Sequence, residues 1–146
     1  MHKPKVFLDS SVIIAAILSS QGGSFYILNQ LKDMCIFQTN EYVFLEIQEI
    51  LRTKFIKHPL LTNYFLVLLG TAGVVMLPNP PKSNVLRAHE SISLNDAPIL
   101  AAALLSSDYL LTLDNEFFNH RVSSFVAKNN LIISKPKEFI EKMREL

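Results

Sequence analysis

Short apolar segments alternate along the chain with longer segments in which apolar residues recur at the helical period. The short segments predict strands at residues 6–8, 35–37, 74–77, 109–112 and 131–133. The longer segments predict helices at residues 10–18, 24–31, 40–55, 60–69, 95–105 and 136–144. Strands that alternate with helices pair in parallel through right-handed crossovers. We therefore expect a three-layer α/β/α domain with a central parallel sheet of about five strands.

Polar residues and prolines mark where these elements begin and end. Ser10 and Ser11 are predicted to cap the first helix, and Thr39 or Asn40 to cap the third. Three prolines between residues 78 and 81 predict that residues 78–93 form a loop with one helical turn. No linker, internal repeat or low-complexity tract interrupts the pattern, so we expect one domain over residues 1–146.

Composition narrows the setting in which this domain works. Hydrophobic residues make up 49% of the 146 residues, which favours a compact globule. No apolar run approaches the roughly 20 residues of a membrane helix, so no membrane contact is expected. The single cysteine, Cys35, cannot form an internal disulfide and favours a reducing cytoplasm. Because the net charge is only +1, any nucleic acid must be bound by local patches.

Three of the five aspartates stand where predicted strands end or where an apolar helix begins. Asp9 follows the strand at residues 6–8, Asp114 follows the strand at residues 109–112, and Asp96 precedes an apolar helix. Ligands of parallel sheets bind just beyond the carboxyl ends of the strands. Carboxylates gathered there repel one another unless a cation lies among them, and Mg²⁺ or Mn²⁺ suits oxygen-only ligands. The pattern predicts a metal-dependent nuclease.

Two glutamates extend this acidic group. Glu46 lies one helical turn from both Val43 and Ile50, at the edge of an apolar helix face, and is expected to face the strand ends. Glu116 is a candidate fifth carboxylate in the loop after Asp114. Taken singly, an aspartate before a helix is more often a cap than a catalytic residue. The prediction therefore depends on the joint pattern.

Four segments also match a known family. They are the strand, Asp9 and apolar helix at residues 6–14, the acidic helix at residues 46–51, the helix start at residues 95–103, and residues 112–117 around Asp114. In this order and spacing they resemble PIN domains, and residues 132–139 resemble the family's last strand and helix. The resemblance covers essentially the whole chain. It is closest to the VapC-like ribonucleases, the toxin components of toxin–antitoxin pairs.

The resemblance implies the chemistry of the site. It implies a Mg²⁺ or Mn²⁺ centre made by four core acids, Asp9, Glu46, Asp96 and Asp114. Ser11 would orient the first carboxylate, and Glu116 would be a variable fifth acid. The pair Ser10 and Ser11 replaces commoner residues of the family, which is a mild departure. The implied activity is that of an endoribonuclease that cleaves single-stranded RNA and has a cognate antitoxin protein as partner.

The chemistry of a bound metal shapes what else the site needs. A carboxylate-bound Mg²⁺ lowers the pKa of a bound water and offsets charge on the transition-state oxygens, so no histidine base is required. His120 with Arg121, and the basic cluster at residues 52–58, are candidates for phosphate contacts. The cluster is equally typical of a solvated helix end. Three aromatic residues are more typical of a core than of base stacking: Phe117, Phe118 and Phe125.

Other functions fit the residues less well. A phospho-receiver domain needs an acceptor aspartate after its middle strand, and no aspartate occurs between Asp33 and Asp96. A phosphatase with an aspartate nucleophile needs a second acid two residues on, where Ser11 stands. The alternative that stays open is a catalytically inactive PIN-fold module that binds RNA or protein.

Two further properties are expected of the folded protein. The apolar helical face at residues 64–69 exceeds what one small sheet can cover, which predicts a homodimer. No Lys or Arg adjoins any of the four core acids in the sequence. At least one of these acids is therefore expected to have a raised pKa in the metal-free protein.

Overall fold

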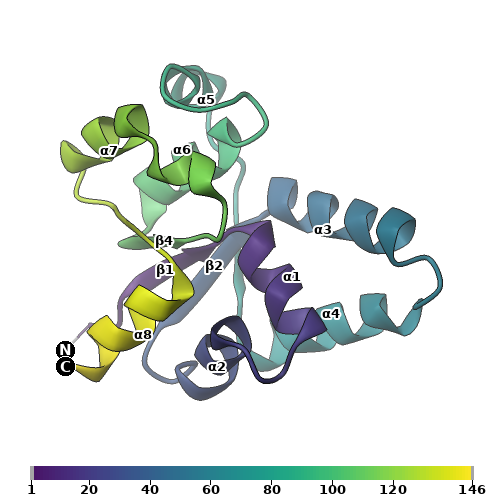
Figure 1. Cartoon of the computed structure of the whole chain (residues 1–146). Helices are drawn as coiled ribbons and strands as arrows, with labels where there is room; N and C mark the ends of the chain where they lie inside the picture. Colours follow the sequence, from purple (N-terminus) through teal and green to yellow (C-terminus); the bar gives the residue numbers. More distant parts are fainter. Residues whose placement is uncertain (1, 146) are drawn as a thin grey trace.

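A parallel sheet of five strands runs through the centre of the molecule (Figure 1). The computed structural model describes residues 2–145. The strands are β1 (Lys5–Leu8), β2 (Ile36–Asn40), β3 (Val75–Leu77), β4 (Tyr109–Leu111) and β5 (Ile132–Ser134), and their spatial order is β3-β2-β1-β4-β5. Each neighbouring pair is parallel, and Val6 in the central strand lies opposite both Phe37 and Tyr109. All five carboxyl ends therefore open on the same edge of the sheet.

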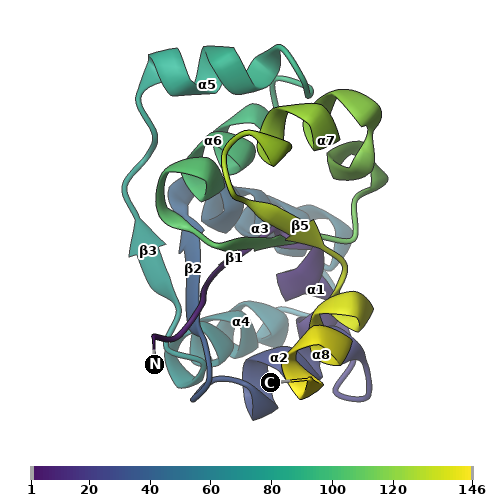
Figure 2. The same ribbon diagram turned by 90° about the vertical axis from the view of Figure 1, so that its left-hand side faces the viewer.

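Helices cover both faces of this sheet (Figure 2). One layer contains α1 (Ser10–Leu18), α2 (Gly23–Gln30) and α8 (Pro136–Arg144), and the other contains α5 (Lys82–His89), α6 (Ala97–Ser106) and α7 (His120–Ala127). The last three residues of β1 are apolar and fully buried between the layers, and the inward residues of α1 and α6 are buried as well. The predicted three-layer α/β/α architecture with a five-stranded parallel sheet is confirmed.

The starts of α1 and α3 (Glu41–Lys54) show how the chain turns at the carboxyl edge. Asp9 is the N-cap of α1, because its Oδ1 accepts a hydrogen bond from the backbone N–H of Ser10 at 2.8 Å. The prediction that Ser10 and Ser11 form the cap is therefore wrong, since the Ser11 hydroxyl lies in the first turn and donates to Asp9. Asn40 caps α3 as predicted, with its Oδ1 accepting from the N–H of Val43 at 3.1 Å.

Two segments are helical where the sequence predicted otherwise. The predicted loop with one turn contains α5, an eight-residue helix. Pro81 occupies its N-cap position, where a missing N–H costs no helical hydrogen bond. The 3₁₀ helix η1 (Asn115–Phe118) and α7 lie in a stretch whose apolar pattern predicts no element. Helix α7 buries only Val122 and Val126, which is too short a signal to establish a helical period.

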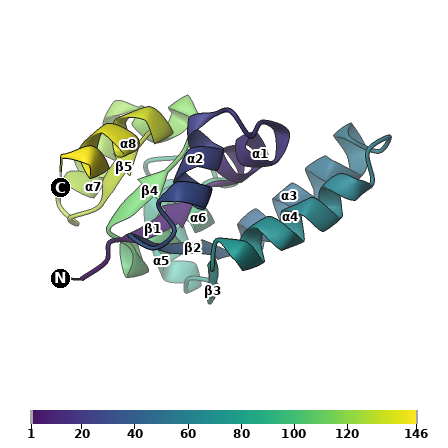
Figure 3. The same ribbon diagram turned by 90° about the horizontal axis from the view of Figure 1, so that it is seen from below.

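Helices α3 and α4 (Leu60–Thr71) run side by side and extend away from the sheet as an arm, residues 41–71 (Figure 3). Between the two helices the rings of Phe44 and Phe65 pack with their centroids 5.2 Å apart. Several large apolar side chains on the outside of the arm are exposed: Leu45, Ile56, Leu60, Leu66 and Val67. The arm therefore joins the core at its base and presents apolar surface to the solvent further out.

The sequence also raised two smaller points, the lack of a membrane-spanning helix and the state of the single cysteine. Within residues 2–145, no single helix is long and apolar enough to cross a membrane. Helices α1 and α2, which meet at 93°, are together long and apolar enough to cross one, by length and composition only. Cys35 is buried and forms no disulfide, and burial raises the pKa of its thiol to about 11.

Candidate metal centre

Asp9 lies at the carboxyl end of the central strand and is only 3% exposed. Its backbone N–H donates to the carbonyl of Leu111 at 3.0 Å, which extends the pairing of β1 with β4 by one residue. The Asp9 side chain therefore lies where the two strands end together, and it also closes the first turn of α1. The fold places this carboxylate at the ligand-binding edge that the sequence predicted.

Two hydroxyl groups hold the Oδ2 atom of Asp9. Ser11 Oγ donates to it at 3.0 Å, and Thr112 Oγ1 donates to it at 2.6 Å. Each hydroxyl also accepts a backbone N–H at 3.0 Å, Ser11 from Leu113 and Thr112 from Asp114. Because both hydroxyl oxygens accept from the backbone, their protons are directed toward the carboxylate. The segment after β4 is thereby tied to the start of α1 through Asp9.

Thr112 is a site residue that the sequence analysis missed. It is fully buried, and its hydroxyl connects two of the predicted acids, Asp9 and Asp114. The one signal that could have indicated it is its place two residues before Asp114, the spacing of a turn in which a hydroxyl accepts a backbone N–H. Ser11, in contrast, orients the Asp9 carboxylate as the sequence resemblance implied.

The electrostatic environment of Asp9 disfavours its charged form. Burial raises the pKa of Asp9 above its ordinary value of 3.8, and repulsion from Glu46 adds to that effect. The hydrogen bonds from Thr112, Ser11 and Ser10 act in the opposite direction on the pKa of Asp9. Asp9 is thus a carboxylate that its neighbours orient but do not neutralise.

Asp96 reaches the same edge from the position just before α6. It occupies the N-cap position, but its side chain makes no capping hydrogen bond and instead accepts from Ser93 Oγ at 3.1 Å. Partial burial raises the pKa of Asp96 to about 6, with smaller contributions from Asp114, Asp9 and Glu46. Helix capping therefore does not account for its position. The expected raised pKa among the acids is confirmed, although burial contributes more to it than repulsion.

The remaining acids come from two further elements. Asp114 is half-buried at the start of η1, and its Oδ1 accepts a hydrogen bond from the backbone N–H of Glu116 at 3.0 Å. Glu46 is exposed on α3, yet lies close enough to raise the pKa of both Asp9 and Asp96. Glu116 is exposed and is not among the carboxylates that raise the pKa of Asp96. The structure therefore brings Asp9, Asp114 and Glu46 within electrostatic range of Asp96 and leaves Glu116 beside them.

The donor chemistry of the four acids suits a hard divalent cation, because all their ligand atoms are carboxylate oxygens. In the part of the chain that the structure describes, the only ion pair joins Arg52 to Glu49, so no basic side chain neutralises the acids. Among residues 2–145, no three His, Cys, Asp or Glu side chains are grouped so as to hold one metal ion. Binding would therefore require side-chain rotation, for which exposed Glu46 and half-buried Asp114 have room.

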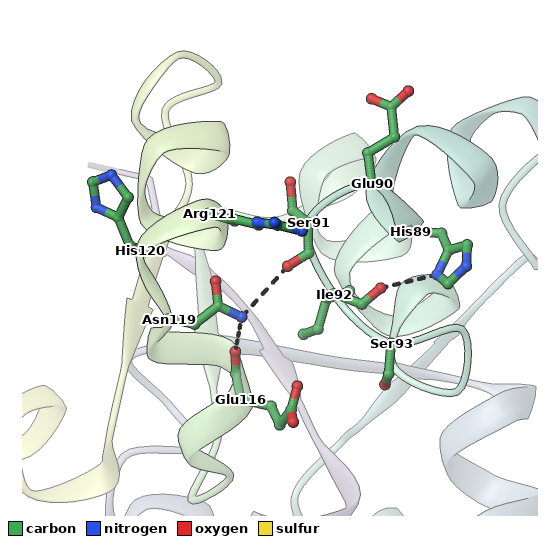
Figure 4. A pocket seen from close by; sticks show the side chains of 9 residues that line it. All are labelled: His89, Glu90, Ser91, Ile92, Ser93, Glu116, Asn119, His120 and Arg121. Carbon is green, nitrogen blue, oxygen red and sulfur yellow. Dashed lines mark hydrogen bonds between the residues drawn. The ribbon is translucent and has the colours of Figure 1, made fainter.

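A polar cleft of about 410 Å³ adjoins the acids (Figure 4). The segment between α5 and α6 forms one wall, and the segment from η1 into α7 forms the other. Its lining residues are His89, Glu90, Ser91, Ile92, Ser93, Glu116, Asn119, His120 and Arg121. The cleft therefore contains His120 and Arg121, two of the residues that the sequence suggested for contacts with RNA.

The other candidate contacts for nucleic acid lie in different surroundings. Arg52, in the basic cluster of the arm, is exposed and forms a hydrogen-bonded ion pair with Glu49, with an N–O distance of 2.7 Å. Phe117 is buried in the core, and Phe125 is partly buried and packs against that core. Phe118 is 37% exposed, and the Lys135 Nζ lies 5.5 Å from its ring centroid. Only one of the three aromatic rings is therefore open enough to stack on a base.

No family model and no curated protein matches the chain. The crystal structure of PAE2754 from Pyrobaculum aerophilum matches with a TM-score of 0.68 and 16% identity, over 99% of this chain and 100% of that one. The structure of VapBC2 from Rickettsia felis, bound to a DNA fragment from their promoter, matches with a TM-score of 0.67 and 16% identity, over 90% and 98%. At this identity the likeness shows the fold alone, and the chain has the PIN-domain fold that its sequence motifs implied.

Proposed function

We propose that this protein is a metal-dependent endoribonuclease that cleaves single-stranded RNA. The observation that carries the proposal is the convergence of four carboxylates on the carboxyl edge of the sheet without a basic side chain to neutralise them. Holding acids together in this way costs free energy unless a cation or a proton compensates. Capping accounts for Asp9 and Asp114 taken singly, but it does not account for Asp96, whose side chain makes no capping hydrogen bond.

In this proposal the core acids have separate roles. Asp9, Asp96 and Asp114 would hold Mg²⁺ or Mn²⁺, and Glu46 on α3 would be the fourth ligand. A cation bound there would supply a water of lowered pKa and would offset charge on the phosphate oxygens. Ser11 and Thr112 keep the Asp9 carboxylate in one orientation, which is the function of residues that support metal ligands. Glu116 we assign to the adjoining cleft rather than to the ligand set.

The biological role that we propose is that of the toxin in a toxin–antitoxin pair. The structure of VapBC2 from Rickettsia felis was solved bound to a DNA fragment from their promoter. By analogy of fold, a small antitoxin protein would bind this chain and inhibit its ribonuclease activity. Copurification with the product of an adjacent reading frame is the measurement that tests this role.

We also propose that the protein forms a homodimer and that the arm is the interface between the two copies. Leu66 and Val67 on α4 are 49% and 58% exposed, and Leu60 at the start of the same helix is 76% exposed. Leu60 and Val67 are seven residues apart and therefore lie on one face of α4, and an exposed apolar face often marks an interface. A second copy of the chain would cover it. The predicted face at residues 64–69 is only partly available, because Phe65 and Leu68 are buried in the core.

The experiment that tests the proposed activity is a cleavage assay with labelled single-stranded RNA. Cleavage is expected with Mg²⁺ or Mn²⁺ and is expected to stop in excess EDTA. A single-stranded DNA of the same sequence tests the preference for RNA. The alternative, an inactive module of the same fold, predicts RNA or protein binding without cleavage under any of these conditions.

A further inference from the structure

The polar cleft beside the acids has two fixed walls. Asn119 joins them, because its Nδ2 donates to the backbone carbonyl of Ser91 at 3.4 Å and to that of Glu116 at 2.8 Å. The Oδ1 of Asn119 also caps α7 by accepting from the N–H of Val122 at 2.9 Å. On the far wall, the Nδ1 of His89 donates to the carbonyl of Ile92 at 3.0 Å and closes the turn after α5. The cleft is therefore formed by hydrogen-bonded segments rather than by loose side chains.

Each wall of the cleft is also connected to one of the core acids. Ser93, in one wall, donates its hydroxyl to Asp96. Glu116, in the other wall, donates its backbone N–H to Asp114. A group that occupies the cleft would therefore lie directly beside the site where we place the metal. In a polynucleotide bound at that metal, this is the position of a nucleotide next to the phosphate that is cut.

The lining of the cleft mixes donors with acceptors. Figure 4 shows Arg121 extending from α7 toward Ser91, and the Glu116 carboxylate lying between Asn119 and Ser93, whereas Glu90 and His120 point away. Neither Arg121 nor Glu116 takes part in a salt bridge within the described residues. A phosphate alone would be repelled by Glu116, so the cleft does not suit a simple anion. A nucleobase edge, which carries both donors and acceptors, matches this lining.

We propose, on the basis of the proposed ribonuclease function, that this cleft binds the base of the nucleotide next to the scissile phosphate and prefers guanine. Arginine donates two hydrogen bonds to O6 and N7 of guanine. A carboxylate accepts from the adjacent N1–H and N2–H groups of guanine, and no other standard base offers two adjacent donors of that kind. The volume of about 410 Å³ lies within the range of ligand pockets, roughly 300–1,000 Å³. Arg121 and Glu116 would then determine where the enzyme cuts.

The first test measures binding without cleavage. GMP, AMP, CMP and UMP are added in turn to the metal-free protein in EDTA, and NMR follows the side-chain signals of Arg121 and Asn119. GMP is expected to shift both signals at concentrations where the other three nucleotides have little effect. Equal shifts with all four nucleotides, or shifts confined to residues outside the cleft, would overturn the proposal.

The second test maps cleavage sites in a library of random single-stranded RNA. The wild type is expected to show guanine at one fixed position relative to the cut, with a preference of roughly tenfold from one bidentate contact. Arg121→Ala is expected to lose that preference while its cleavage stays dependent on Mg²⁺. Lys128→Ala removes the same charge from the exposed end of α7, outside the cleft, and is expected to keep the preference.

The two tests separate the inference from the function on which it depends. Metal-dependent cleavage without a base preference overturns the cleft assignment and supports the ribonuclease. A selective response to GMP without any cleavage supports the cleft and overturns the ribonuclease. A preference that survives in Arg121→Ala overturns the assignment of Arg121.

Discussion

The carboxyl edge of the sheet and the outer surface of the arm depart from ordinary protein surfaces in opposite ways. At the edge, a carboxylate is buried: Asp9 is 3% exposed and has no basic partner. On the arm, large apolar side chains are exposed, and Ile56 and Leu60 are 72% and 76% accessible. Charged groups are rarely buried unless they are paired, and extended apolar patches are rarely exposed on monomers.

The comparison indicates that the two regions lack different partners. The edge needs positive charge, because Asp114, Asp9 and Glu46 each add to the raised pKa of Asp96. The arm needs a second apolar protein surface to bury its exposed side chains, which a small cation cannot provide. We therefore expect changes at the edge to affect catalysis and metal binding, and changes on the arm to affect association. Each prediction below tests one side of that division.

The largest effect is expected at the edge. Asp9→Asn and Asp96→Asn each remove a proposed ligand and should lower RNA cleavage by on the order of 1,000-fold, since a bound metal contributes several kcal/mol to transition-state stabilisation. Rates of RNA cleavage in Mg²⁺ measure this. Asp33→Asn and Asp108→Asn are the controls. Asp33 is exposed in the turn after α2, and Asp108 accepts from the backbone N–H of Lys5 at the amino end of the sheet. Equal losses in all four variants would show that the site is misplaced.

A smaller effect is expected on the arm. The double substitution Leu66→Lys and Val67→Lys should weaken the homodimer on the order of 100-fold or more, because burying a charge in an apolar interface is costly. Sedimentation measures the monomer fraction at micromolar concentration. Leu86→Lys is the matched control, because Leu86 lies on α5, outside the arm, and is 51% exposed, much like Leu66 and Val67. A wild type that sediments only as a monomer would remove the arm as a dimer interface.

The same comparison explains what could be predicted from the sequence. The edge was predictable because strand ends and helix starts are local signals, and parallel pairing brings them together whatever the loops do. Asp9, Asp96 and Asp114 follow that rule. Thr112 does not, because its importance arises from two contacts made only after β1 and β4 are paired.

Errors in the element assignments have equally local causes. Ser10 and Ser11 are good caps in isolation, but the aspartate before them caps the same helix through Oδ1, and its Oδ2 still accepts from the hydroxyls of Ser11 and Thr112. Helix α7 is amphipathic, but it is only eight residues long and buries two apolar residues, so its pattern is too short to predict a helix. The exposed apolar side chains of the arm could be counted in the sequence, but which of them are buried depends on how α4 packs on α3.

The charge repulsion at the edge predicts a stabilising substitution. Asp114→Asn should stabilise the metal-free protein by on the order of 1 kcal/mol, because it removes one of the charges that act on Asp96. Thermal melting in EDTA and in Mg²⁺ measures this for both proteins. Mg²⁺ should raise the Tm of the wild type more than that of the variant. A variant that melts lower in EDTA and gains as much from Mg²⁺ would show that Asp114 serves only as the cap of η1.

The smallest effect concerns pH, and it also separates the edge from the arm. The pKa of Asp96 is about 6 in the folded protein, above the 3.8 of the free group, so the folded state holds that proton more tightly than the unfolded chain does. The contribution of Asp96 to stability is therefore greatest at low pH, declines as pH rises from about 4 to about 6, and is constant above that range. Asp96→Asn cannot ionise, so in EDTA its Tm should rise relative to the wild type across the same window. The difference should be only about 1–2 °C, because Asp96 is half-exposed and solvent screens its charge. The double arm variant Leu66→Lys and Val67→Lys leaves the acids unchanged and should show no such pH-dependent difference. If the difference in Tm between the wild type and Asp96→Asn is the same at pH 4 and pH 7, then the surroundings of Asp96 do not disfavour its charged form.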